Sequence, residues 1–483
     1  MAAGTVARQT EPGLLERLFK LRANGTTVST EVIGGVTTFF VMAYIIALNP
    51  IILNFVGIKD LQDAKLGPGF APTVAMTALT AGVLTIAMGL YANRPFAMAA
   101  GLGLNAVVAF QLILGSKLAW PAAMGIILME GIVITVLVLT GLRETILNAI
   151  PLALKRSIGV GIGLFILLIG LFNAGFVVRG PAGGPPVGLS LLNSGPLLTF
   201  VLGLGITLFL FARGVKAALL AGIVVTTLVA TILHALVPSY VASTAPGTAM
   251  IPSKFFDAPD LSTVFRGLNF DSFAAIGLVG TVLAVFTIML SDFFDTMGTV
   301  IGIGGQAGWL DDKGRMPGVR NILLVDSIGA AFGGLMSASS NTTYIESAAG
   351  VSSGARTGLA SVVTGVLFLL AMFLAPTVAV IPPEATAPAL VIVGFLMAGI
   401  ATKINLENID EGLPALLTMA VMPFTYSITN GIGAGFVSYA FIKLVRGKAR
   451  EVHPLMWAVV IAFILYFAQN AYAPLIGTGS YRE

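Results

Sequence analysis

The sequence contains no cysteine and only two histidines, His234 and His453. Without cysteine the chain cannot form disulfides, bind a metal through thiolates or use a thiol nucleophile. Two histidines leave little material for a histidine-based metal site, so we expect neither a metal nor a cofactor. No serine–histidine, paired-aspartate or histidine–glutamate arrangement has a spacing that favours an enzyme. Function is therefore expected to depend on carboxylates, amides and hydroxyls.

Charged residues are also scarce, at 10% of the 483 positions, whereas globular domains usually carry about 25%. Hydrophobic residues make up 57% of the chain, and the mean hydropathy is +0.96. This is too little polar material to cover a soluble surface. The net charge is only +4, so the basic pI does not indicate nucleic-acid binding. The composition predicts an all-α polytopic membrane protein embedded in a lipid bilayer.

Apolar runs of about 20 residues, the length that crosses a bilayer core, recur along nearly the whole chain. The first begins with EVIGGVTTFFVMAYIIALNPIIL, and six more precede a long polar loop at 238–270. Those six are expected at 73–92, 97–115, 121–142, 157–174, 196–212 and 216–237. After the loop we expect spans at 272–302, 318–337, 338–353, 356–381, 386–402, 412–429, 431–446 and 455–474. Pro414, Pro423 and the break TNGIG suggest two short helices within 412–446 that do not each cross fully.

The distribution of basic residues predicts the orientation. The first 30 residues lack the apolar core of a secretory signal, and LLERLFKLR is typical of a short amphipathic helix on the inner face. With the N-terminus inside, most Lys and Arg residues fall on inner ends. The outer ends carry six: Lys59, Lys65, Lys117, Arg179, Lys254 and Arg266. This bias predicts a cytoplasmic N-terminus in the cell (inner or plasma) membrane.

Two segments differ from ordinary spans. The third, PFAMAAGLGLNAVVAF, is rich in glycine and alanine around Asn105, and the tenth, GGLMSASSNTTYIESAAGVSSG, is small and polar. Seven spans before the loop start the second half on the opposite side, as an inverted-topology repeat requires. Glycine-interrupted segments at corresponding positions of two repeats indicate a transport site. We expect each to begin as extended chain and continue as a half-helix whose N-terminal amides hold a polar ligand.

Two aspartates, Asp292 and Asp295, interrupt the eighth span in IMLSDFFDTMGTVIGIGG. A carboxylate at mid-membrane costs about 2.5–3.5 kcal/mol on insertion scales and persists only with a partner, water or a proton. Three positions apart on a helix, the two lie on neighbouring positions of one face. We expect Asp295 to face a polar cavity and Asp292 a neighbouring helix. Gly298 is expected to allow close approach of another segment.

Glu346 follows the polar run Thr342, Thr343 and Tyr344, near the start of the predicted half-helix. An acid is electrostatically favoured there for structural reasons. The polar run, however, has no other reason to lie in a membrane, so Thr343 and Glu346 are expected to contact substrate. Asn105 either contacts substrate or forms an interhelical hydrogen bond.

Two of three further acids are open to two interpretations. Glu130, in GIILMEGIVI, and Asp326, in ILLVDSIGA, lie within apolar runs and either tie helices together or carry protons. Glu31 opens the first span and is expected at the membrane interface.

Four motifs in order, GGVTTFFVMAYIIALNP, AGLGLNA, DFFDTMGT and NTTYIESAAGV, resemble the azaguanine-type purine permeases. These form a branch of the nucleobase–ascorbate transporter (xanthine/uracil permease) superfamily. The resemblance runs from about residue 14 to the tail EVHPLMWAV. It implies fourteen transmembrane segments as two inverted repeats of seven, with the third and tenth built as a short strand plus a half-helix. It also implies an elevator movement of a core domain against a gate domain, often in a homodimer.

The same resemblance divides the chain into domains. Residues 1–30 form a cytoplasmic N-terminal segment, and 241–271 form an extracytoplasmic loop. The core domain comprises 31–143 and 272–382. The gate domain comprises 144–240 and 383–483, including the C-terminal tail.

By this resemblance Asp295, with Gly298, and Glu346 and Asn105 bind the substrate, together with the side chain of Thr299 and the backbone around Ile345. The implied function is import of adenine, guanine or hypoxanthine by proton symport, with Asp295 or Glu346 carrying the proton. Sodium coupling would use similar oxygen ligands and stays open. A uracil or xanthine symporter and an anion transporter of sulfate-permease-like architecture compete with this function. Two acids argue against an anionic substrate.

Overall fold

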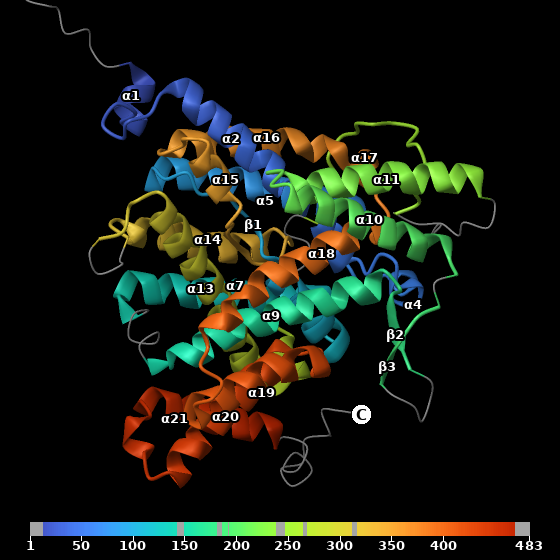
Figure 1. Ribbon diagram of the computed structural model, residues 1–483. Helices are drawn as coiled ribbons and strands as arrows, with labels where there is room; N and C mark the ends of the chain where they lie inside the picture. Colours follow the sequence, from blue (N-terminus) through green and yellow to red (C-terminus); the bar gives the residue numbers. More distant parts are fainter. Residues whose placement is uncertain are drawn as a thin grey trace, which may run out of the picture.

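Long apolar helices lie roughly side by side across the molecule (Figure 1). The computed structural model describes residues 13–468, except 143–148, 181–185, 192, 238–246, 264–267 and 312–315. Within these ranges ten helices are long and apolar enough to cross a bilayer, and Leu102–Gly115 and Pro454–Phe467 are shorter apolar helices. The predicted polytopic helical architecture is confirmed. The number fourteen stays a prediction.

The elements of the first half fall close to the expected spans. They are α1 (Leu14–Phe19), α2 (Val28–Met42), α3 (Ile45–Leu53), α4 (Lys59–Asp63), α5 (Phe70–Ala87), the π-helical η1 (Met88–Ala92), β1 (Met98–Ala100), α6 (Leu102–Ala106), the π-helical η2 (Val107–Gly115), α7 (Trp120–Thr140), α9 (Leu152–Asn173), β2 (Val177–Arg179), β3 (Val187–Leu189), α10 (Gly195–Ala212) and α11 (Ala218–Leu236).

The second half begins after the polar loop. Its elements are α12 (Ser272–Ala275), α13 (Gly277–Gln306), α14 (Val319–Leu335), β4 (Asn341–Thr343), α15 (Ser347–Ser352), α16 (Gly358–Ala371), the 3-10 turn η3 (Met372–Leu374), α17 (Ala375–Val378), α18 (Pro383–Ala398), the 3-10 turn η4 (Gly399–Lys403), α19 (Ile409–Thr425), α20 (Ile428–Val445), the 3-10 turn η5 (Ala449–Glu451) and α21 (Pro454–Phe467). The end of the span expected at 455–474 lies outside the described residues.

Local sequence explains several helix ends. The hydroxyl of Thr27 accepts a hydrogen bond from the Thr30 amide and caps α2, and Ser427 caps α20 in the same way. Tyr426, with φ at +50°, ends α19 in the left-handed region. Two separate helices therefore lie within 412–446, as predicted, but they meet at Tyr426 and the expected break TNGIG lies inside α20.

Apolar side chains cover the outside of the helices. Phe209 of α10, Phe395 of α18 and Phe424 of α19 are 62%, 62% and 85% exposed. Polar residues occupy buried positions instead, among them Glu31, Asn49 and Asp292. This is the distribution expected where the solvent is lipid, because apolar side chains then lose nothing by facing outward.

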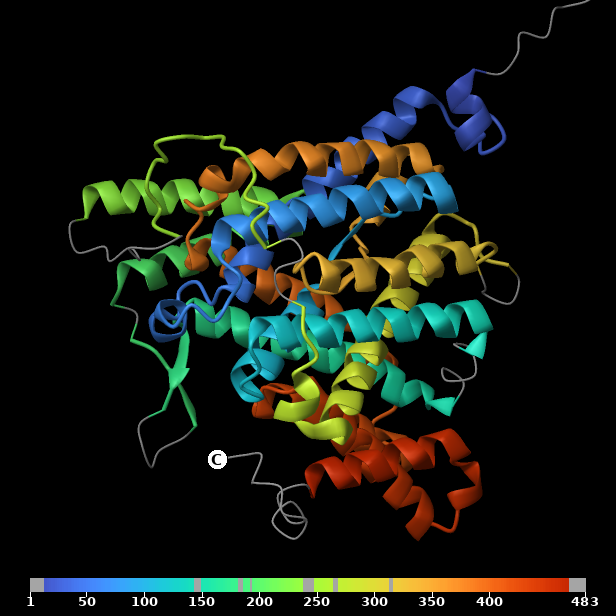
Figure 2. The same ribbon diagram turned by 180° about the vertical axis from the view of Figure 1, so that it is seen from behind.

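The two ends of the molecule differ in what they carry. In Figures 1 and 2, α1 lies at the same end as the connection between α20 and α21, and the ribbon of β2 and β3 lies at the opposite end. β2 and β3 pair antiparallel, with Val177 opposite Leu189. The basic residues of α1 and those at the end of α20 therefore lie at the same end of the molecule.

Candidate functional site

Two short strands from distant parts of the chain pair with each other inside the molecule. β1 pairs antiparallel with β4, with Met98 opposite Thr343 and Ala100 opposite Asn341. α6 follows β1 directly, and α15 follows β4 after a short turn. The predicted construction of the third and tenth segments, a short strand followed by a half-helix, is confirmed.

The chain must approach itself closely where β1 becomes α6. The Gly101 amide donates to the Ser340 carbonyl at 3.0 Å, and a Cβ on Gly101 would lie 3.0 Å from Cγ2 of Thr342. A larger residue would press against β4. On the other side of the ribbon, the Tyr344 amide donates to the Ala97 carbonyl at 2.9 Å. These bonds place the starts of the two half-helices beside each other.

Helix α13 turns a polar face toward this ribbon. The Thr296 hydroxyl lies 2.7 Å from the Thr342 hydroxyl of β4 and donates to Oδ2 of Asp326 at 2.7 Å. Thr299, one turn further along the same face, is buried. Asp292 is fully buried, whereas Asp295 is only half-buried. Asp295 is therefore the more accessible of the two aspartates, and its expected position at a polar cavity stays a prediction.

The two predicted acids come together from separate elements. Glu346 precedes α15 and is half-buried, and its carboxylate accepts a hydrogen bond from the Tyr44 hydroxyl. Asp295 of α13 is close enough to Glu346 for the two carboxylates to interact electrostatically. The site thus concentrates negative charge and hydrogen-bond acceptors, a combination suited to a ligand that presents N–H donors.

Two buried polar groups on the two strand-plus-half-helix segments have no hydrogen-bond partner among the described residues. Asn105 is fully buried, and neither its Oδ1 nor its Nδ2 has a hydrogen-bond partner among the described residues. The hydroxyl of Thr343 is buried and equally unpartnered within this part of the chain. Buried polar atoms are usually paired, so unpaired ones require an explanation such as a bound ligand.

Ile345 lies between Thr343 and Glu346 with its side chain 49% exposed. Its Cδ1 lies 3.4 Å from where a Cβ on Gly302 of α13 would stand. The backbone around Ile345 is thus placed between the α15 half-helix and α13. All six residues predicted to bind substrate lie on α6, α13 or the β4–α15 segment, and α13 contacts each of the others.

The structure corrects one expectation. Gly298 of α13 is exposed, and a Cβ there would meet nothing within 4 Å, so no described segment approaches it closely. Glu31 has a role that the sequence does not predict. It is fully buried and accepts hydrogen bonds from the backbone amides of Arg356, Thr357 and Ala360 at 2.7 to 3.2 Å. It caps the start of α16, because helix N-termini present unpaired N–H groups.

The sequence does not predict the role of the Tyr44 hydroxyl. Tyr44 stands within FFVMAYIIALNP, where an apolar run makes any aromatic look like packing. Its hydroxyl finds Glu346, 302 residues away. The feature that sets Tyr44 apart is its position at the break between α2 and α3.

A large cavity lies elsewhere. It has a volume of about 1750 Å³ and opens toward the β2–β3 end, between η2, α9 and the α19–α20 turn. Its walls include Gln111, Phe172 and Tyr426, but none of the predicted site residues. No three of His, Asp or Glu in the described ranges are placed to hold a metal ion.

Comparisons with known proteins identify a family. Residues 29–434 match the sequence profile described as the permease family. The guanine/hypoxanthine permease PbuG of Bacillus subtilis is 38% identical over 94% of this chain and 99% of its own length. The adenine permease AdeP of Escherichia coli is 39% identical over 94% of this chain and 96% of its own length.

Among solved structures, the transmembrane domain of the cyanobacterial bicarbonate transporter BicA resembles this fold with a TM-score of 0.59. The match covers 84% of this chain and 96% of that domain, at 15% sequence identity. At that identity the likeness concerns the fold alone.

Proposed function

We propose that this chain, which belongs to the permease family and within it to the azaguanine-type purine permeases, is a secondary active transporter that imports purine nucleobases. The observation that carries the proposal is the electrostatic interaction of two acids, Asp295 of α13 and Glu346 beside α15. α13 also contacts α6, where the side-chain amide of Asn105 has no hydrogen-bond partner among the described residues. The similar proteins named for guanine/hypoxanthine and for adenine support purines as the substrates.

The chemistry of a purine suits these groups. The base is flat and neutral, and its edges alternate hydrogen-bond donors and acceptors. A carboxylate accepts two hydrogen bonds from adjacent N–H groups, so acids on α13 and beside α15 can hold opposite edges of one base. The amide of Asn105 and the hydroxyls of Thr299 and Thr343 supply both donors and acceptors.

The coupling ion in this proposal is a proton. Asp295 and Glu346 belong to segments that are expected to lie within the bilayer. An unpaired, charged carboxylate there has a high free energy, so either residue can take up a proton as the base binds. Sodium would need several oxygen ligands at short distances. The experiment below distinguishes the two ions.

Movement is proposed to follow an elevator mechanism. The core would comprise 31–143 and 272–382, and the gate 144–240 and 383–483. Helix packing supports this division: α16 packs on α2 and α5, and α14 on α7, whereas α18 packs on α9 and α19 on α20. The site residues all belong to the proposed core, so the base would travel with that domain.

The proposed setting is the plasma membrane, with the N-terminus in the cytoplasm and two chains forming a homodimer. The excess of Lys and Arg on the inner ends supports the orientation. The homodimer rests on the family resemblance alone.

Two further substrate classes are tested in the same experiment. A uracil or xanthine symporter would use the same carboxylate clamp on a smaller or more oxidised ring. An anion transporter would share the fold, as the likeness to a bicarbonate transporter illustrates. Asp295 and Glu346 disfavour it, because an anion would meet two like charges at the site.

The test is uptake of radiolabelled hypoxanthine into proteoliposomes, with an inward proton gradient, an inward sodium gradient or neither. Adenine, uracil, xanthine and bicarbonate serve as competitors. We expect the proton gradient alone to drive uptake and adenine to block it. Asp295→Asn and Glu346→Gln should each lower uptake by about tenfold or more, the effect of a lost hydrogen bond to a charged group.

Asp63→Asn is the matched control, because it removes the same charge from an exposed position on α4. It should transport normally. Competition by uracil alone would assign the protein to the uracil branch. Full transport by both site variants, in correctly inserted protein, would refute the site.

A further inference from the structure

A third carboxylate lies deep in the membrane, apart from the proposed purine clamp. Glu130 is the eleventh residue of α7, the helix Trp120–Thr140, and it is fully buried. It is the single titratable residue of that helix. Its Oε2 accepts one long hydrogen bond, 3.3 Å, from the Ser340 hydroxyl. Its Oε1 has no hydrogen-bond partner within the described part of the chain.

Close packing encloses this carboxylate. α7 crosses α14 where a Cβ on Gly131 would lie 2.5 Å from Cα of Ala331, and a Cβ on Gly334 would lie 2.7 Å from the Leu128 amide nitrogen. The next glycine of α14, Gly333, lies against the Ser339 backbone. Glycines at such a crossing bring the two backbones together and exclude bulk water from between them.

No positively charged group bonds to Glu130 among the described residues. Ser340, whose hydroxyl donates to Glu130, is flanked in the chain by Ser339 and Asn341. Ser339 Oγ and Asn341 Oδ1 are buried and, like Glu130 Oε1, have no partner in the described part of the chain. Asp326 of α14 is the acid that acts on Glu130 electrostatically.

The other charged groups on the helices that pack against α7 are few. α13 brings Asp292 and Asp295, both acids, and α14 brings Arg320. The guanidinium of Arg320 is engaged at the end of α7, where it donates to the Leu139 carbonyl at 3.2 Å. A buried carboxylate that accepts one long hydrogen bond and is acted on by another acid is strongly disfavoured in its charged form.

Asp326 differs from Glu130 in its surroundings. Its Oδ2 accepts from the Thr296 hydroxyl at 2.7 Å, and its Oδ1 accepts from the Thr343 amide at 2.9 Å. These donors stabilise a charged carboxylate, and they tie α14 to α13 and β4. Of the two acids that the sequence leaves undecided, Asp326 serves as the tie, and Glu130 is left with one long hydrogen bond.

A hydrogen-bonded chain connects Glu130 with the substrate site. The hydroxyl of Ser340 donates to Glu130, and the carbonyl of the same residue accepts from the Gly101 amide at 3.0 Å. The Gly101 carbonyl in turn accepts from the backbone amide of Asn105 at 2.8 Å. A change of charge at Glu130 therefore acts on the backbone that positions both half-helices.

We propose that Glu130 binds a coupling proton at a site separate from the purine, with the carboxylic acid forming in this conformation and the carboxylate in the conformation that releases the proton. The step is protonation alone, a carboxylate plus a proton giving a carboxylic acid. This inference rests on the proposed proton-coupled purine transport, and it assigns the coupling proton of that transport to Glu130 in place of Asp295 or Glu346.

Glu130→Gln tests the proposal, because the amide imitates the protonated acid and still accepts from Ser340. With a proton gradient of one pH unit and one proton per base, wild-type protein should accumulate purine about tenfold, since one pH unit is a tenfold ratio of protons. Glu130→Gln should lose this accumulation while exchange of internal for external purine continues at a near-normal rate. Glu407→Gln, an exposed residue, controls for the loss of one negative charge.

Infrared spectroscopy gives a readout that does not depend on transport. The carbonyl stretch of a buried carboxylic acid should be present in the wild-type protein and absent from Glu130→Gln. In Ser340→Ala the acid stays but loses its hydrogen bond, so the band should move to higher wavenumber. This second variant keeps the test valid if Glu130→Gln does not fold.

The outcomes separate the two levels of the argument. If wild-type protein neither exchanges nor accumulates purine, the proposed function fails. If wild-type protein accumulates purine and Glu130→Gln accumulates it equally, Glu130 is not the coupling site. An infrared band that is unchanged in Glu130→Gln and in Ser340→Ala overturns the proposal as well, and so does accumulation driven by sodium alone.

Discussion

At the scale of single residues, the site combines side chains that have partners with side chains that have none. Glu346 is already held by the Tyr44 hydroxyl, and Tyr344 donates to the Ala100 carbonyl. Asn105 has no partner for either atom of its amide among the described residues. A hydrogen bond within the protein holds a group in position. An unpaired buried group, in contrast, can bond to a ligand without first breaking a hydrogen bond to the protein.

Tyr44→Phe should raise KM for purine about tenfold or more, because hydrogen bonds to charged groups contribute about 1.5–3 kcal/mol. Loss of the Tyr44 hydroxyl frees the Glu346 carboxylate to turn away from the base. Tyr344→Phe is the matched control, since its hydroxyl bonds a backbone carbonyl. It should lower the thermal midpoint and leave KM nearly unchanged. Initial uptake rates over a range of hypoxanthine concentrations measure both, and equal KM values for all three proteins would contradict the assignment.

Asn105→Leu should weaken purine binding without destabilising the protein. Leucine has a similar size, and replacing an unpaired buried amide removes a desolvation penalty of about 1–3 kcal/mol, so the thermal midpoint should stay equal or rise. Asn49→Leu is the contrasting variant. Asn49 is equally buried, but its Nδ2 donates to the Thr77 hydroxyl at 2.7 Å, so its loss should lower the midpoint and spare binding. A fall in stability for Asn105→Leu would show that its amide is paired.

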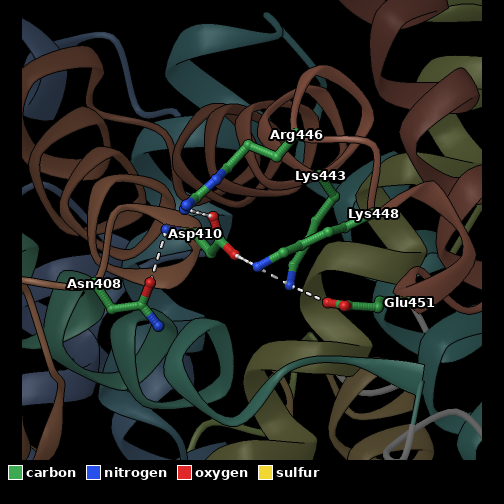
Figure 3. A network of polar contacts seen from close by, with 6 residues as sticks. All are labelled: Asn408, Asp410, Lys443, Arg446, Lys448 and Glu451. Carbon is green, nitrogen blue, oxygen red and sulfur yellow. Dashed lines mark hydrogen bonds and ion pairs between the residues drawn. The ribbon is translucent and has the colours of Figure 1, made fainter.

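At the scale of elements, a polar network joins the ends of α19 and α20. Figure 3 shows Asp410, in the first turn of α19, with Arg446, Lys448 and Lys443 directed toward it. Lys448 Nζ lies 2.9 Å from Asp410 Oδ2, Arg446 donates to Oδ1, and Lys443 bridges to Glu451 at 2.5 Å. Hydrogen bonds from Lys448 and then Arg446 lower the pKa of Asp410 to about 2. The network holds the start of α19 against the end of α20.

The pH dependence of this network has a definite sign. An aspartate with a lowered folded-state pKa adds stability above its unfolded pKa of about 3.9, and that stability is lost as pH falls toward about 2. Asp410→Asn should therefore lower the thermal midpoint in detergent at pH 7, and the difference from wild type should shrink between about pH 4 and pH 2. Glu451→Gln, at a side chain 55% exposed, should have a smaller effect at neutral pH. A difference that is independent of pH would contradict the ion-pair explanation.

At the scale of the whole molecule, the orientation in the membrane follows from how basic residues are shared between the two ends. α1 and the connection from α20 to α21 lie at one end in both views (Figures 1 and 2). The natural chain has no cysteine, so any cysteine introduced is the single thiol of the molecule. This makes topology directly measurable.

Cysteines at exposed Ala23 and Arg450 should resist a membrane-impermeant maleimide in intact cells and react after permeabilisation. A cysteine at exposed Ser253, in the long loop before α12, should react in intact cells. All three variants should keep purine uptake, which verifies their fold. Labelling of Ala23→Cys and Arg450→Cys from opposite sides would refute the return of the α19–α20 pair to the inner face. Labelling of these two in intact cells, with Ser253→Cys protected, would show the opposite orientation of the whole molecule.

Much of the fold could be predicted from the sequence because its signals are local. Hydrophobic run length predicted the long helices, and the small, polar composition around Asn105 and Glu346 predicted the strand plus half-helix pair. The prediction for Gly298 was wrong, since a glycine's sequence context does not reveal whether a neighbour approaches it. The amides that Glu31 caps could not be predicted for a similar reason, because they belong to α16 and the turn before it.

The sequence by itself determined that this chain is a membrane protein, which end of it carries positive charge, and which few residues are polar against an apolar background. Those properties depend on composition and on neighbours along the chain. Only the tertiary structure decided that Tyr44 holds Glu346 and that Asp326 is paired while Glu130 keeps one long hydrogen bond. Pairing depends on contacts between residues far apart in the sequence, and such contacts exist only once the helices have packed.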